Sequence, residues 1–116
     1  MGYPHFSNYC DDFHRLVADT GPLVDIHDER GRQDAKWGLQ SHPDGTGGEL
    51  ARELCDAMKA AVDLDARDGG TNWASILMEE ILEAFAETDP TTLRTELVQS
   101  GAVIAAWIEH IDRRAA

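Results

Sequence analysis

The chain has 116 residues, which suits a single domain, and its 22 acidic residues against 10 lysines and arginines give a formal charge of −12. Nucleic acids and anionic membranes need a basic surface, so we expect neither as a partner. The sequence has no apolar run that would span a bilayer and no segment of signal-peptide type. Its two cysteines, Cys10 and Cys55, suit a reducing compartment, so we expect a cytoplasmic protein.

The N-terminal part is expected to form an extension, residues 1–21, that precedes the main bundle at residues 22–114. Aromatic and apolar residues recur there every three or four positions, which predicts a short helix over 7–18. Gly21-Pro22 interrupts that pattern.

Residues 23–38 are predicted to form the first main helix, which begins with apolar residues and is strongly polar afterwards. Its basic residues, such as Arg32 and Lys36, allow two interpretations. They can contact phosphate groups, or they can pair with acids of the same helix, such as Glu29. Trp37 likewise can stack on a base or pack in the core.

A loop over 38–48 follows, because Pro43-Asp44-Gly45 favours a turn. Apolar residues at helical spacing then predict a second helix over Glu49–Arg67, which the glycine pair at 69–70 ends.

The stretch from residue 72 to residue 99 is predicted to form a third helix, a sharp turn and the start of a fourth helix. Thr71 or Asn72 is expected to cap the third helix. Asp89 suits the cap of the fourth helix and Pro90 its first position, so this helix is expected over Pro90–Arg113. So short a turn makes the two helices antiparallel neighbours.

Acidic side chains lie beside the apolar faces of these two helices. Glu80 and Glu83 follow the apolar row of the third helix, and Glu96 and Gln99 lie at the border of the fourth. Buried carboxylates are costly unless protons, basic side chains or a cation neutralise them. Carboxylate oxygens are the ligands that Mg²⁺ prefers, so the pattern favours a divalent-metal site. The alternative is a solvated acidic face.

This acidic pattern resembles the signature of a known family. Glu79-Glu80-x-x-Glu83, then twelve residues, then Glu96-x-x-Gln99, is similar to the EExxE…ExxD motif of the MazG-like, all-α nucleoside triphosphate pyrophosphohydrolases. The family's last acid is usually Asp, whereas Gln99 offers an amide oxygen without charge.

The resemblance extends from about residue 24 to residue 114 and implies an antiparallel four-helix bundle that assembles as a homodimer or homotetramer. It implies hydrolysis of a nucleoside triphosphate to the monophosphate and pyrophosphate with Mg²⁺, or else Mn²⁺. The implied roles in this sequence fall into three groups. Glu79 would act on the attacking water; Glu80, Glu83, Glu96 and Gln99 would bind metal; and Arg32, Lys36, Trp37 and Gln40 would bind substrate, with Gln33 behind them.

Two other functions stay open. Because Gln99 removes one charge, the chain can be a MazG-like module that binds nucleotide or a protein partner with weak or no hydrolysis. It can also be a purely structural bundle whose acids are solvated.

Overall fold

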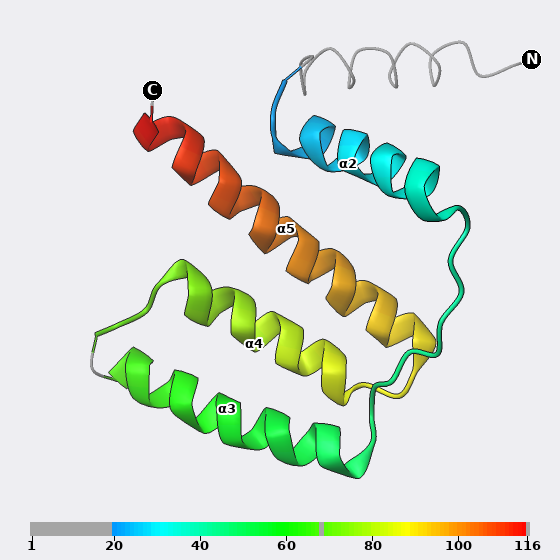
Figure 1. The fold of residues 1–116 in the computed structure, drawn as a ribbon. Helices are drawn as coiled ribbons and strands as arrows, with labels where there is room; N and C mark the ends of the chain where they lie inside the picture. The colour runs from blue at the N-terminus through cyan, green and yellow to red at the C-terminus, as the bar shows by residue number, and fades with distance from the viewer. Residues whose placement is uncertain (1–19, 68, 116) are drawn as a thin grey trace, which may run out of the picture. The chain divides into compact units, whose positions relative to one another are not determined.

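A computed structural model describes residues 20–67 and 69–115, apart from the side chains of residues 65 and 66. The short helix expected over 7–18 lies outside these residues. The described residues form four α-helices and no strand, which confirms the all-α prediction (Figure 1). The helices are α2 (Pro22–Trp37), α3 (Glu49–Arg67), α4 (Trp73–Ala86) and α5 (Pro90–Ala115). None of these helices combines the length and the apolar character needed to cross a membrane.

Local capping sets the helix bounds close to those expected from the sequence. The Asn72 side chain accepts a hydrogen bond from the Ser75 N–H at 2.9 Å and so caps α4. The Asp89 carboxylate accepts from both the N–H and the hydroxyl of Thr92, each at 2.9 Å, ahead of Pro90 at the start of α5. These bonds satisfy N–H groups that the first turn of a helix leaves unpaired.

The chain divides into two compact units, residues 1–41 and residues 42–116. Helix α2 belongs to the first unit and α3, α4 and α5 belong to the second. The prediction that residues 22–114 form one four-helix bundle therefore stays a prediction.

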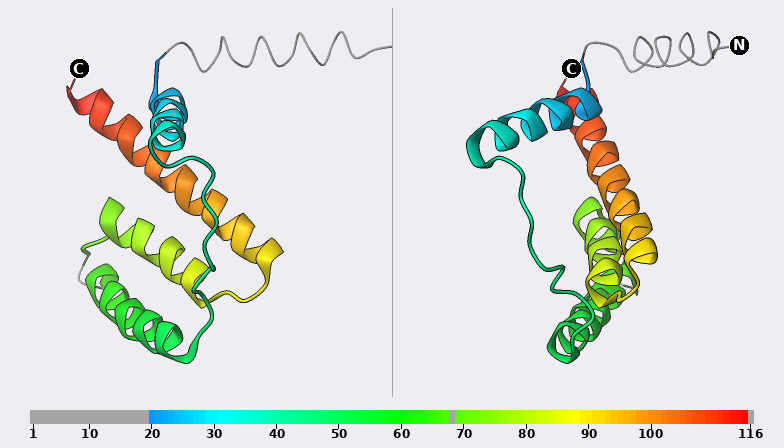
Figure 2. Two further views of the ribbon diagram at one scale, coloured as in Figure 1. Left: turned by 45° about the vertical axis from the view of Figure 1, so that its right-hand side comes forward. Right: turned by 90° about the vertical axis from the view of Figure 1, so that its right-hand side faces the viewer.

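Within the second unit, the three helices form a single layer. Helix α4 contacts both α3 and α5, whereas α3 and α5 do not contact each other. Neighbouring helices of this unit run in opposite directions (Figures 1 and 2). A single layer of helices can bury only the edges at which they meet, so its core is thin.

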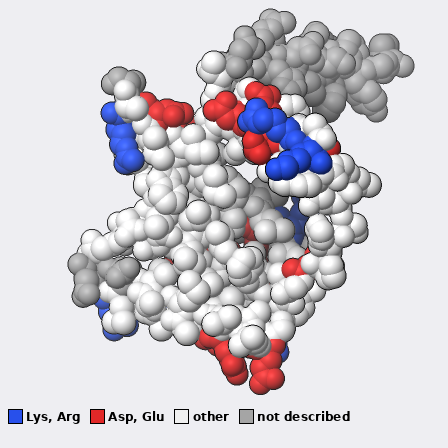
Figure 3. Space-filling model, viewed as in Figure 1, with Lys and Arg blue, Asp and Glu red and all other residues white. Residues whose placement is uncertain are grey.

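The buried residues of this layer are few and mostly small. They are Cys55, Ser75, Leu82, Ala84, Leu93, Ser100 and Ala105. Large apolar side chains stay accessible, including Leu50 at 69% and Phe85 at 50% of full exposure. On the face in Figure 3, the charged side chains of this unit lie mainly towards the ends of its helices. A wholly apolar cavity of about 390 Å³ lies between α3 and α4, lined by residues that include Met58, Met78 and Ile81.

Two contacts join distant segments of the second unit. The Trp73 indole N–H donates to Nδ1 of His110 at 2.7 Å, linking the start of α4 to the far end of α5. The backbone N–H of Gly47 donates to the Phe85 carbonyl at 2.9 Å. Gly47 has φ of 76° and lies so close to Thr88 that a Cβ there would collide with its methyl group. This bond fixes the end of the loop at the turn between α4 and α5.

Candidate functional site

Three acids follow one another along α4 toward its C-terminal end. Glu80 and Glu83 are three residues apart, and Glu87 lies one turn further on, where it caps the helix. Oε1 of Glu87 accepts hydrogen bonds from the backbone N–H groups of Thr88 at 3.1 Å and Asp89 at 3.2 Å. The turn that follows α4 therefore holds the Glu87 carboxylate in place.

Glu96 of α5 lies opposite these acids and is partly buried. Its Oε2 is shielded from solvent and has no hydrogen-bond partner among the described residues. Burial raises the pKa of the Glu96 carboxyl above its ordinary value, and the negative charges of Glu87, Glu83 and Glu80 raise it further. A buried oxygen without a partner is costly, so this carboxyl favours a proton or a cation.

The structure thus brings Glu80 and Glu83 within electrostatic reach of Glu96, with Glu80 partly buried and Glu83 exposed. The other two predicted site residues are placed differently. Glu79 is partly buried on α4 but is not among the charges that act on Glu96. Gln99 is exposed on α5.

The donor set and the unpaired oxygen of Glu96 suit a hard cation, because carboxylate oxygens are its preferred ligands. The acids nevertheless do not form a ready-made set of ligands. In residues 20–67 and 69–115, no three His, Cys, Asp or Glu side chains are arranged so that they could hold a metal ion. Binding would require their side chains to rotate toward one another, and the four predicted ligand roles stay predictions.

Glu87 is not among the acids that the sequence analysis proposed as ligands or catalytic groups. Among the three neighbouring acids, Glu87 contributes the largest charge effect at Glu96. The signal was present in the spacing, since Glu80, Glu83 and Glu87 occupy the i, i+3 and i+7 positions of one helix stripe.

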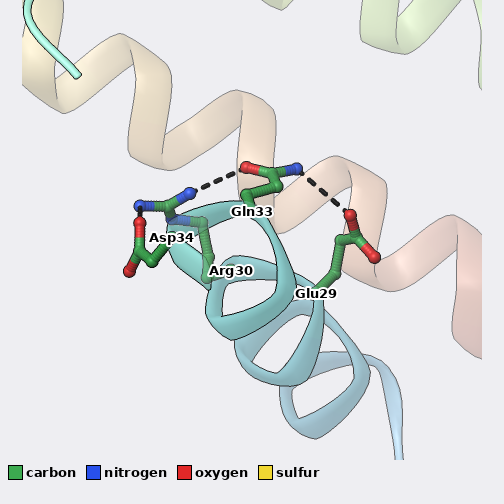
Figure 4. A network of polar contacts seen from close by, with 4 residues as sticks. All are labelled: Glu29, Arg30, Gln33 and Asp34. Atoms are coloured by element: carbon green, nitrogen blue, oxygen red, sulfur yellow. Dashed lines mark hydrogen bonds and ion pairs between the residues drawn. The ribbon is translucent and has the colours of Figure 1, made fainter. Parts of the chain in front are cut away.

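On α2, the charged residues pair within their own helix. Arg32 donates from Nε to Oε1 of Glu29 at 2.8 Å, and this hydrogen bond lowers the pKa of the Glu29 carboxyl. Arg30 donates to Gln33 at 2.7 Å and to Asp34 at 2.8 Å, and Gln33 donates to Glu29 at 3.4 Å (Figure 4). These contacts correspond to the intrahelical alternative to phosphate binding.

The remaining predicted substrate residues lie at the end of α2 and just beyond it. The Lys36 ammonium lies 4.7 Å from the centroid of the Trp37 ring, a cation–π geometry. Trp37 is 58% exposed, and Gln40 is exposed in the loop. Arg32, Lys36, Trp37 and Gln40 all belong to the first unit, so their place in one pocket with the acids stays a prediction.

No family model matches the chain, and comparison with curated proteins and with solved structures finds no similar protein.

Proposed function

We propose that this chain is a Mg²⁺-dependent nucleoside triphosphate pyrophosphohydrolase, of the MazG-like type, that releases pyrophosphate and a nucleoside monophosphate. The observation that supports this proposal most directly is the unpaired, buried Oε2 of Glu96, in a carboxyl on which the charges of Glu80, Glu83 and Glu87 act. Carboxylates held close together are unstable without a counter-charge, and a hard divalent cation supplies one.

The proposed roles follow the chemistry of each side chain. Glu80, Glu83 and Glu96 would hold the ion, with the neutral Gln99 amide as a weak further ligand. The bound ion would supply charge neutralisation at the phosphate oxygens. Glu79, the remaining acid on this part of α4, would orient the attacking water and accept its proton.

Substrate recognition is assigned to residues of α2 and the following loop. Lys36 would contact phosphate oxygens, and Trp37, with its ring exposed, would stack on the base. Gln40 would hydrogen-bond to the substrate. Arg32 would have to exchange its Glu29 partner for phosphate, so we assign it the weaker contact.

The test is pyrophosphate release by the purified protein with Mg²⁺ and each of the common ribo- and deoxyribonucleoside triphosphates. We expect release from at least one of them, and we expect Glu83→Gln to abolish it. Glu109→Gln is the matched control, because Glu109 is an exposed glutamate on the C-terminal half of α5 and should leave the rate unchanged. If none of the nucleotides yields pyrophosphate, the enzymatic proposal is wrong.

A second candidate is a module that binds nucleotide or protein without hydrolysis. The exposed, uncharged Gln99 favours it, because the family motif has an acid at that position. Replacing Gln99 by Asp separates the two functions. Activity that appears only in Gln99→Asp would support the binding module, whereas activity in the natural chain would exclude it.

The thin core of the helical layer also supports a homo-oligomer, either a dimer or a tetramer. A small domain that leaves large apolar side chains exposed gains stability when a second copy covers them.

A further inference from the structure

Helix α3 carries a row of exposed apolar residues that neither α4 nor α5 of its own unit covers. The row consists of Leu50, Leu54, Ala57, Ala61 and Leu64. Their spacing alternates between four and three residues, which is the repeat of a coiled-coil seam. All five residues are exposed, with the three leucines between 54% and 69% accessible.

This row borders the stripe of α3 that packs on α4. Ala51, Cys55 and Val62 are buried or partly buried, and Ala51 and Cys55 line the cavity between α3 and α4. Leu54 also lines that cavity at its open edge but keeps 56% of its surface exposed. Helix α3 therefore has two adjacent apolar stripes, and its neighbour in the layer uses one of them. A second exposed stripe of regular spacing is typical of a helix that meets another helix.

A second copy of α3 matches this row better than α2 does. Helix α2 has large apolar side chains only near its start and at its last residue, Trp37, so it offers no repeating apolar row. The part of the row from Leu54 to Leu64, by contrast, is self-complementary when two copies run antiparallel, and Leu50 lies beyond the paired layers. Leu54 of one copy then lies opposite Leu64 of the other, and Ala57 lies opposite Ala61.

We propose that α3 is the interface of a homodimer in which this row pairs, antiparallel, with the same row of a second copy. Alanines form the central layers of the interface, which lets the two helix backbones approach closely, and leucines form the outer layer at either end. The proposal specifies the contact surface of the homo-oligomer proposed above and does not depend on hydrolysis.

Charge supports the same register. With Ala57 opposite Ala61, Glu53 of one copy flanks Arg67 of the other, and the two-fold symmetry repeats this pair. Both side chains are exposed, and neither forms an ion pair with any side chain in the described part of the chain. Within one chain they are fourteen residues apart, roughly 21 Å along the helix, so they cannot pair with each other.

Charge reversal provides the experiment, with the dissociation constant measured by sedimentation on the full chain. Glu53→Arg alone, or Arg67→Glu alone, places like charges together twice in a dimer, so each should weaken dimerisation about tenfold. The double variant restores both pairs with reversed signs and should dimerise like the natural chain. Lys59→Glu is the control, because Lys59 lies on α3 away from the seam and its reversal should change little.

A mixture of the two single variants gives the most specific result. One chain with Glu53→Arg and one with Arg67→Glu form opposite-charge pairs at both ends, so we expect a heterodimer tighter than either homodimer. Each variant serves as the other's folding control, because a misfolded chain could not be rescued by mixing.

Three outcomes contradict the interface. If the natural chain stays monomeric at all concentrations, the binding partner of the row is the chain's own N-terminal part or another protein. A dimer that neither Glu53→Arg nor Arg67→Glu weakens uses a different surface, and a mixture no tighter than its components excludes the antiparallel register. Loss of the proposed hydrolysis would alter none of these results, because they report association alone.

Discussion

The two units of the chain satisfy their polar groups in different ways. On α2, the contacts of Glu29, Arg30, Arg32, Gln33 and Asp34 join residues three or four apart, and these side chains lie in water or near it. The unit of α3 to α5 has local bonds at its helix caps, and in addition Trp73 pairs with His110 and Gly47 with Phe85, across almost forty residues in each case.

The difference shows how to interpret a charged helix. An ion pair between two side chains one helical turn apart adds little stability and indicates little about function. Glu96 has acids rather than a base as its neighbours, and one of its oxygens has no partner among the described residues. Such an arrangement opposes stability, so it points to a ligand more strongly than the charge run on α2 does.

The largest effect on stability is expected from Gly47→Ala. The new Cβ would meet Thr88, and the positive φ would be strained, so we expect a loss of about 2–3 kcal/mol in the free energy of unfolding. Gly45→Ala is the control, since Gly45 has φ of 72° with open space around it, and about 1 kcal/mol is expected there. Urea titrations measure both. Equal losses would show that the contact with Thr88 is unimportant.

A smaller loss is expected from Trp73→Phe. Phenylalanine retains most of the ring but has no N–H for Nδ1 of His110, so we expect about 1 kcal/mol of destabilisation. The comparison variant is Trp107→Phe, which keeps the aromatic contact with Trp73 without touching the hydrogen bond. Thermal unfolding with a second probe, near-UV circular dichroism, reports on both. A larger loss from Trp107→Phe would contradict a specific role for the Trp73 bond.

Glu96→Gln is expected to stabilise the protein at neutral pH in the absence of metal. The gain in the free energy of unfolding should be smaller than the loss caused by Trp73→Phe. The folded state raises the pKa of Glu96, so it binds this proton more tightly than the unfolded chain does. The resulting stability is complete below the ordinary pKa of glutamate, about 4.3, and is lost as the pH rises through the raised pKa. The gain from Gln should therefore be present at pH 7 and vanish at about pH 4.

The effect of Mg²⁺ on the melting temperature provides a second test of Glu96→Gln. If the proposed site exists, Mg²⁺ raises the melting temperature of the natural protein by mass action, and Glu96→Gln reduces that rise. Melting curves at both pH values, with Mg²⁺ and with a chelator, separate the two effects. A gain from Gln that is equal at pH 4 and pH 7 would disprove the titration of Glu96.

The smallest effect is expected from Arg32→Gln on α2. The Arg32–Glu29 pair is exposed and lies within one helix, so its removal should leave the melting temperature almost unchanged. If Arg32 also contacts substrate phosphate, the same variant raises KM in the hydrolysis assay. A clear loss of stability would show instead that α2 depends on this pair and would weaken the contrast between the two units.

Helix bounds in this chain follow from local chemistry that the sequence displays. The second main helix was predicted over Glu49–Arg67, as observed, because apolar residues recur at helical spacing and a glycine pair follows its last residue. Asp89 and Pro90 likewise placed the start of α5, since a cap needs only the few residues around it. The end of α5 was placed two residues early, at Arg113 rather than Ala115, because the exposed last turn has no sharp stop signal.

The site could be predicted only in part. Helix spacing placed Glu80 and Glu83 on one side of α4, and a short turn brought α5 beside them. Spacing could not reveal that Glu87, held by the backbone of the turn, raises the pKa of Glu96 more than Glu80 or Glu83 does. It also gave Gln99 a place beside Glu96, whereas the structure leaves Gln99 exposed. A residue's position on a helix gives its direction, but its solvation depends on the neighbouring helix.

The sequence by itself determined the helices and their caps, because these depend on residues within one or two turns of each other. Only the tertiary structure decided which charged oxygen loses its water and which apolar row of α3 stays uncovered. Both depend on how the surfaces of separate helices meet, and a pattern within a single helix does not contain that information.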